Sequence, residues 1–350
     1  MRTYRITGRF PERSFVRITI IGAGAIGSIC GVYLTKAGRA VTLVEPWREH
    51  LERIKKGAYI DGVRGEMTVP LNAIMPGEVK EPLELVLLAV KSGKTLEALE
   101  NIRPFIHADT VVVSLQNGFN VDMIASAIGR EHVVGCVIGW GATSVGPGHL
   151  TQTSEGRFVV GELDGKLSDR LGMVKDILSD ISEVTLTQSI YGHLWSKLSI
   201  NCLIAGCGVL GLNVGEALAP ERNKRVFIQL VREVMNVATA CGVRPEMVEG
   251  VVDPLIFTRT DTEGLDTCFR ILDMMAAVHG SIKPGPLQDI EKGWESEVDY
   301  ITGYCVKKGL EIETPTPINE KVHALIKGME AKRVIPRPEN IGLLEAAAKG

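Results

Sequence analysis

The chain has 350 residues, of which 45% are hydrophobic and 23% charged, and its formal net charge is −3 at pH 7. This length suits two domains, and the charge argues against a broad basic surface for nucleic acid or an acidic membrane. Seven cysteines are scattered without a C-x-x-C pair, and the histidines are scattered too. We therefore expect free thiols in a reducing compartment, with no disulfide framework and no metal site.

The first residues are polar and basic and contain no apolar run of signal-peptide type. No stretch of the chain is long and apolar enough for a membrane span. We expect residues 1–16 to be a disordered leader and the protein to be cytoplasmic.

A β-branched run at residues 17–21 leads directly into a glycine-rich turn, and a helix-forming stretch follows from Ser28 to Lys36. The turn reads G-x-G-x-x-G and consists of Gly22, Ala23, Gly24, Ala25, Ile26 and Gly27. In the strand–turn–helix context this motif predicts a dinucleotide site, with the helix N-terminus directed at the pyrophosphate. A glycine-rich loop of an unrelated α/β protein is the alternative.

A second predicted strand, residues 40–44, ends in Glu45. An acid at this place can accept hydrogen bonds from the ribose hydroxyls of NAD and would repel a 2′-phosphate. We therefore predict NAD as the cofactor. NADP stays an alternative, because Arg48 could swing toward a phosphate.

Apolar runs alternate with helical stretches up to about Leu186, as in a parallel sheet covered on both faces. Predicted strands at 83–90 and 110–115 are followed by Lys91 and Asn117, at the sheet edge where ligands bind. Another strand is predicted at 132–138. Two Gly-rich strands, 148–153 and 156–162, are expected to add antiparallel strands at one edge of the sheet.

Beyond Ile190 only helical patterns remain, at about 192–205, 224–241, 265–279, 288–308 and 319–327. The fold class is thus α/β, an N-terminal Rossmann-type doubly wound sheet with an all-helical C-terminal domain. We assign residues 17–187 to the dinucleotide-binding domain, 188–335 to a helical substrate or dimerisation domain, and 336–350 to a tail, whose Ala-rich end from Leu343 to Gly350 is expected to fray.

Four polar residues recur every four positions at the start of the helical region: Ser189, His193, Lys197 and Asn201. This spacing places them as one stripe on a helix. Such a stripe is either a solvated face or part of a site in the cleft between the domains. Asn201 favours the site, because it lies inside an apolar run.

These motifs together resemble the ketopantoate reductase (2-dehydropantoate 2-reductase) family over about residues 17–330. The similarity is carried by the glycine turn and, in the family's order, by Val90-Lys91, Leu115-Gln116-Asn117-Gly118, Trp195-x-Lys197-Leu198-x-x-Asn201 and Gln288-Asp289…Glu297-x-Asp299. The resemblance implies a Rossmann domain, a helical domain often involved in dimer contacts, and reduction of a 2-oxo acid.

The resemblance also implies roles for individual residues. Lys197 matches the catalytic lysine, the general acid that protonates the carbonyl oxygen, and Asn201 matches an asparagine that orients the substrate. Asn117 matches an asparagine near the nicotinamide and the lysine, and Lys91 a lysine that faces the cofactor–substrate cleft. Glu297 matches the substrate-binding glutamate, which holds the substrate hydroxyl and can pair with the lysine.

The chain departs from the family at two substrate positions. Ala205 stands where a second asparagine is frequent, and Gly285 where a serine holds the substrate carboxylate. A lost hydrogen bond in a desolvated site costs on the order of 1–3 kcal/mol. Either Lys283 or another cation compensates, or the substrate is a different 2-oxo acid or ketone.

The leading hypothesis is NAD(P)H-dependent reduction of a 2-oxo acid to a 2-hydroxy acid, ketopantoate to pantoate or a related pair. The partners implied are a small 2-oxo acid and, as an option, a second copy of the chain. A flavoprotein and a non-catalytic NAD(H)-binding sensor that has lost the ketopantoate site remain as alternatives.

Overall fold

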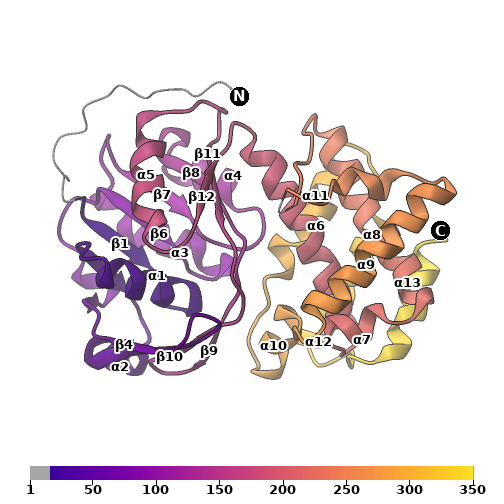
Figure 1. The fold of residues 1–350 in the computed structure, drawn as a ribbon, viewed down its shortest axis with the longest axis horizontal. Coiled ribbons are helices and arrows are strands. Elements are labelled where there is room, and N and C mark those ends of the chain that lie inside the picture. The colour runs from indigo at the N-terminus through magenta and orange to yellow at the C-terminus, as the bar shows by residue number, and fades with distance from the viewer. Residues whose placement is uncertain (1–15, 249, 350) are drawn as a thin grey trace.

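The structure is a computed structural model, and it describes residues 16–248 and 250–349. The predicted leader therefore lies outside the described residues except for Val16. Figure 1 shows two parts side by side, one built around sheets and one built from helices. The expected fold class is confirmed.

The larger sheet has eight strands in the order β12-β11-β8-β7-β6-β1-β2-β5. Its strands are β1 (Ile18–Ile21), β2 (Val41–Val44), β5 (Ala73–Ile74), β6 (Leu85–Leu88), β7 (Val111–Ser114), β8 (Val133–Ile138), β11 (Phe158–Glu162) and β12 (Val184–Leu186). All neighbours pair in parallel except β11 and β8. The carboxyl ends of β1, β2, β6, β7 and β8 consequently share one edge.

Successive side chains of a strand point to opposite faces of the sheet, and each face has its own hydrophobic core. Leu85 and Leu87 of β6 belong to one, which includes residues of α1 (Ala25–Lys36) and α5 (Asp169–Ser179). Val86 and Leu88 belong to the other, which includes residues of α3 (Thr95–Ile102) and α4 (Val121–Ile128) and continues into the helical part. All four side chains are fully buried, as expected for a sheet covered on both faces.

A second sheet of four strands, in the order β4-β3-β10-β9, lies apart from the large one. It contains β3 (Ala58–Gly62), which follows helix α2 (Arg48–Gly57), with β4 (Met67–Val69), β9 (Ala142–Gly146) and β10 (His149–Gln152). The prediction that residues 148–153 extend the large sheet was wrong, because β10 pairs with β3 and β9 instead. Of the predicted strand 156–162, residues Phe158–Glu162 form β11, which pairs antiparallel with β8. It is not the edge strand, because β12 pairs with its other side.

The helical part begins with α6, a long helix that packs against both the large sheet and the other helices. Its helices are α6 (Ile190–Val209), α7 (Val214–Leu218), α8 (Glu221–Ala240), α9 (Thr262–His279), α10 (Gly285–Glu291), α11 (Thr302–Glu311), α12 (Pro317–Glu330) and α13 (Ile341–Ala347). Ile190 rests on Gly135 and Gly161, which face each other on β8 and β11. A Cβ at Gly135 would lie 2.5 Å from Ile190 Cγ1.

Two expectations for the helical part were wrong. The predicted helix 288–308 is broken: α10 ends at Glu291, Gly293 adopts a φ of +72°, and α11 starts only at Thr302. Glycine at positive φ is a common way to end a helix. The expected fraying is not seen over residues 343–347, which belong to α13, where Leu344 is fully buried. Among the described residues, no helix is both long and apolar enough to cross a membrane.

Candidate functional site

The glycine turn connects β1 to α1 and has the shape that a dinucleotide requires. Gly22 adopts a φ of +95°, and a Cβ there would lie 2.9 Å from the backbone nitrogen of Val90. A Cβ at Gly27 would lie 2.0 Å from the carbonyl oxygen of Gly22. At Gly24 a Cβ would meet no atom within 4 Å, so this side of the turn is open. The first turn of α1, with Ala25 and Ile26, presents N–H groups that lack intrahelical partners. The residues present therefore fit a dinucleotide diphosphate.

Glu45, at the carboxyl end of β2, braces this turn. Its buried carboxylate accepts the backbone N–H of Ala23 through Oε2 at 2.9 Å and that of Trp47 through Oε1 at 2.8 Å. Sequence reasoning predicted a ribose contact and missed these backbone bonds. Each carboxylate oxygen can accept a second hydrogen bond, so the two roles are compatible.

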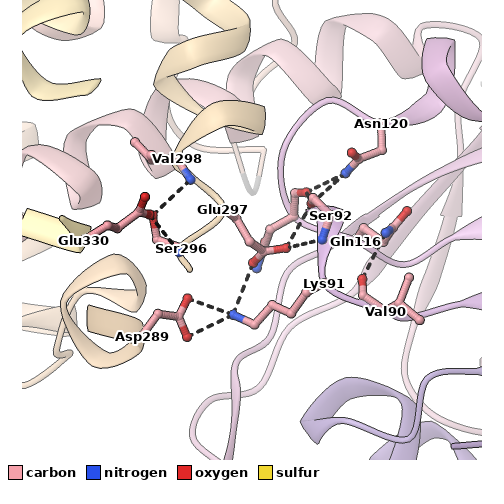
Figure 2. Close-up of polar contacts among 11 residues, drawn as sticks. Val90, Lys91, Ser92, Gln116, Asn120, Asp289, Ser296, Glu297, Val298 and Glu330 are labelled. Carbon is pink, nitrogen blue, oxygen red and sulfur yellow. Dashed lines mark hydrogen bonds and ion pairs between the residues drawn. The ribbon is translucent and has the colours of Figure 1, made fainter. Parts of the chain in front are cut away.

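Lys91 follows β6 and reaches across to the helical part (Figure 2). Its Nζ lies 3.0 and 3.3 Å from the two carboxylate oxygens of Asp289 on α10, and 3.5 Å from Oε2 of Glu297. Burial lowers the pKa of Lys91, but the two carboxylates outweigh it and the net pKa is raised. Burial raises the pKa of Asp289 despite the lysine. Lys91 is therefore held as a cation between two acids.

The loops after β6 and β7 are also tied to the segment that carries Glu297 (Figure 2). Glu297 Oε1 accepts the backbone N–H of Ser92 at 2.9 Å and lies 2.9 Å from the Ser92 hydroxyl. Asn120 donates to Ser92 Oγ at 3.0 Å and to the carbonyl oxygen of Asn117 at 2.8 Å. The side chain of Asn117 is exposed. Three predicted site residues, Lys91, Asn117 and Glu297, thus lie in one polar network.

The polar stripe of the helical part lies on α6, apart from Ser189, which precedes the helix. His193, Lys197 and Asn201 are all partly buried, so the stripe is not fully exposed to solvent. Burial lowers the pKa of His193, against the charge of Glu246. Asn201 Nδ2 is buried and has no hydrogen-bond partner among the described residues. A buried unpaired amide in a native structure is accounted for by a functional role, by local strain, or by an ordered water or ion.

The two positions that depart from the family differ in their surroundings. Ala205 is fully buried in α6. Gly285 is exposed at the start of α10, and a Cβ there would meet no atom within 4 Å. Lys283, considered above as a compensating cation, lies 2.5 Å from Glu291.

Sequence reasoning missed Ser92, Asn120 and the ion pair of Asp289. Asp289 was noted only as part of a motif, and its partner Lys91 is 198 positions away. Asn120 follows the Asn-Gly pair by two residues. Nothing in its local pattern indicates that its side chain connects the loop after β6 with the loop after β7.

A glycine turn open to a diphosphate, at the carboxyl edge of a mostly parallel sheet, is the arrangement of a dinucleotide-binding oxidoreductase. The sequence family described as "Ketopantoate reductase PanE/ApbA" matches residues 18–165, and its "C terminal" counterpart matches residues 189–330. The chain belongs to the ketopantoate reductase family, whose members reduce 2-oxo acids with NAD(P)H.

Individual relatives agree with this assignment. A 2-dehydropantoate 2-reductase of Pyrococcus abyssi is 29% identical over 323 residues, which are 90% of this chain and 98% of the relative. A ketopantoate reductase structure from Ralstonia eutropha JMP134 has a TM-score of 0.77 and 26% identity, covering 91% of this chain and 99% of that one. A D-mandelate dehydrogenase with NADH and anilino(oxo)acetate has a TM-score of 0.80 at 24% identity, covering 91% and 99%, and shares the fold.

Proposed function

We propose that the chain reduces a 2-oxo acid to the 2-hydroxy acid with NADH, and that Lys197 is the general acid. The observation that carries this proposal is the buried, unpartnered Nδ2 of Asn201, one helical turn after Lys197 on the same face of α6. An unsatisfied buried amide costs on the order of 1–3 kcal/mol, which a bound substrate oxygen would offset. The lysine that shares this face is then placed beside the same substrate.

The chemistry needs a proton where negative charge develops. When bound, the reduced nicotinamide supplies a hydride to the carbonyl carbon. The ammonium group of Lys197 stabilises the growing charge on the carbonyl oxygen and donates a proton to it. Asn201 donates a hydrogen bond through Nδ2 and so fixes the orientation of the carbonyl. Lys197 regains its proton from solvent after the product leaves.

The loops of the sheet part supply the remaining contacts in this proposal. Gly22, Gly24 and Gly27, with Ala25 and Ile26, hold the diphosphate. Asn117 presents its exposed amide near the nicotinamide, and Lys91 contributes a positive charge at the carboxyl edge of the sheet. Glu297 holds the Ser92 loop through Oε1, and its Oε2 accepts from the substrate hydroxyl.

For the cofactor we propose NADH over NADPH, with Glu45 toward the ribose. The carboxylate of Glu45 lies at the turn, where a 2′-phosphate would meet like charge. The D-mandelate dehydrogenase of the same fold was solved with NADH, in agreement with this choice. Binding of NADPH would require a cation near its 2′-phosphate, and the exposed Arg48 is the candidate for that contact.

The test is turnover against a panel of 2-oxo acids that includes ketopantoate and benzoylformate, each with NADH and with NADPH. We expect oxidation of NADH with at least one member and weaker use of NADPH. Since Ala205 and Gly285 replace two polar positions, ketopantoate need not be the best substrate. Tight NADH binding without oxidation by any member would contradict the proposal.

A further inference from the structure

His50 is a buried titratable side chain directly behind the glycine turn, and the proposed chemistry does not use it. It lies on α2, is only 2% exposed, and has the ring of Trp47 stacked on it with centroids 5.6 Å apart. Both ring nitrogens have partners. Nδ1 lies 3.1 Å from the backbone nitrogen of Gly148, and Nε2 lies 3.3 Å from Ser28 Oγ.

The partners determine which nitrogen carries the proton. A backbone N–H only donates, so Nδ1 accepts from Gly148 and the neutral ring carries its proton on Nε2. Ser28 gives its single hydroxyl proton to the carbonyl oxygen of Ala23 at 2.6 Å. Its oxygen is then the acceptor for Nε2–H. Three hydrogen bonds therefore run in one direction, from the Gly148 N–H through His50 and Ser28 to the carbonyl oxygen of Ala23. We call this chain of hydrogen bonds the relay.

Ala23 stands between Gly22 and Gly24, at the centre of the turn. Its carbonyl oxygen is held by this relay, and its N–H is held by Glu45 at 2.9 Å. The small sheet thus contributes to the glycine turn of the large sheet, because Gly148 lies in the turn between β9 and β10. A change at His50 alters one of the two polar anchors of the turn.

We propose that neutral His50 is a positioning residue for the glycine turn, and that its protonation weakens dinucleotide binding. A protonated ring would direct Nδ1–H at the Gly148 N–H, donor against donor, and the relay would separate at that point. This inference rests on the dinucleotide role of the turn and does not depend on which 2-oxo acid is reduced.

The surroundings of the His50 ring shift its pKa in both directions. Burial lowers the pKa of His50, whereas the carboxylate of Glu45 at the end of β2 and the backbone carbonyl of Ala23 raise it, and the net pKa is lowered. Ser28 on α1 carries no charge. On α2 itself, the Cβ of Arg53 lies against Gly148, where a Cβ on the glycine would be 2.7 Å away.

The sign of the pH effect follows from that direction. A histidine whose folded pKa is lowered contributes stability above its ordinary pKa, about 6.5, and that contribution is lost as pH falls through the lower folded value. If the dinucleotide binds the neutral form better, its binding must lower the pKa of His50 further, because the coupling is reciprocal.

The experiment measures NADH affinity of the whole chain by fluorescence, without substrate, from about pH 8 down to about pH 4.5, so that the range extends well below the ordinary histidine pKa of about 6.5. We expect affinity to fall with acid in the native chain. His50→Gln should bind more weakly at high pH and lose this pH dependence. Ser28→Ala should bind about fivefold more weakly at high pH, the effect of one lost hydrogen bond.

His132→Gln is the matched control. His132 is also buried, and its Nδ1 lies 2.9 Å from the carbonyl oxygen of Thr110. It precedes β8 and so lies at the sheet edge opposite the glycine turn. This variant should keep the native pH profile of binding.

Nitrogen-15 NMR of the native chain supplies a readout that needs no variant. It should show His50 with its proton on Nε2, titrating below the ordinary range, and a further decrease of its pKa with NADH. Affinity that is flat with pH, or a His50 proton on Nδ1, would overturn the proposal. If NADH does not bind at any pH, the cofactor choice fails, and the same series with NADPH tests the relay.

Discussion

The sheet side and the helix side of the candidate site differ in how fully their polar groups are paired. On the sheet side, the Glu45 carboxylate accepts two backbone N–H groups, and Ser92 donates its backbone N–H to Glu297 of the helical part. On the helix side, Asn201 keeps a buried Nδ2 with no partner among the described residues. The sheet side is thus prepared before any ligand binds, whereas the helix side is completed by the substrate. Four predictions test this contrast.

The largest effect is expected at Lys197. Lys197→Ala should lower kcat on the order of 10²–10⁴-fold, because it removes the general acid, and should leave NADH affinity nearly unchanged. Steady-state kinetics and fluorescence titration measure the two quantities. Lys197→Arg is the control: it keeps the charge but should not restore turnover, since guanidinium is too basic to give up its proton. Retained turnover together with lost NADH binding would contradict the proposal, because Lys197 would then serve cofactor binding and not proton transfer.

Gly27→Ala tests whether the sheet side is as tightly built as described. The added Cβ would lie 2.0 Å from the carbonyl oxygen of Gly22, so the turn must shift. Overpacking of this kind costs about 1–3 kcal/mol of folding free energy. Because the shifted turn no longer fits the diphosphate, we also expect NADH to bind more weakly, by about fivefold or more. Gly24→Ala, where a Cβ meets no atom within 4 Å, separates steric damage to the fold from contact with the cofactor. It should leave thermal stability intact and still weaken NADH binding.

Asn201→Ala should act in opposite directions on binding and on stability. Loss of one hydrogen bond to the substrate should raise KM about 2- to 10-fold. In the chain without substrate, the same change removes an unpaired buried amide, so thermal stability should stay constant or rise. A marked loss of stability without substrate would show that Asn201 is a structural residue.

The smallest effect is expected from Asp289→Asn. Asp289 helps to raise the pKa of Lys91, and a raised lysine pKa gives stability that is lost as pH rises through the folded value. Without Asp289 the pKa of Lys91 should be lower, so the loss of stability at alkaline pH should begin at lower pH. The change in the free energy of unfolding should be no more than about 1 kcal/mol, since Lys91 is half exposed. Thermal unfolding at alkaline pH measures it. Glu97→Gln, which breaks an exposed pair with Lys94, should change nothing.

The sequence allowed the large sheet and the glycine turn to be predicted because both leave local patterns. The turn needs glycine at fixed spacing, and buried strands such as β6 read as continuous apolar runs. The small sheet was not predicted, since the alternation in β10 identifies a strand but not its partner. The break at Gly293 was missed because a lone glycine is tolerated within a helical pattern.

The candidate site was predicted residue by residue but not contact by contact. Lys91, Asn117 and Glu297 were named separately, and the structure joins them through Ser92 and Asn120. Such contacts depend on how two distant segments pack, which no local spacing encodes. The roles of Lys197 and Asn201 stay predictions that the kinetics above will decide.

The contact of Ile190 with Gly135 and Gly161 fixes where helix α6 starts on the sheet. Helix α6 starts where two bare backbone positions leave no room for a methyl group, so its direction is set by the strands beneath it. A small side chain gained at either glycine would tilt the helix and re-aim every residue farther along it. The positions of Lys197 and Asn201 on this helix therefore depend on two glycines of the sheet.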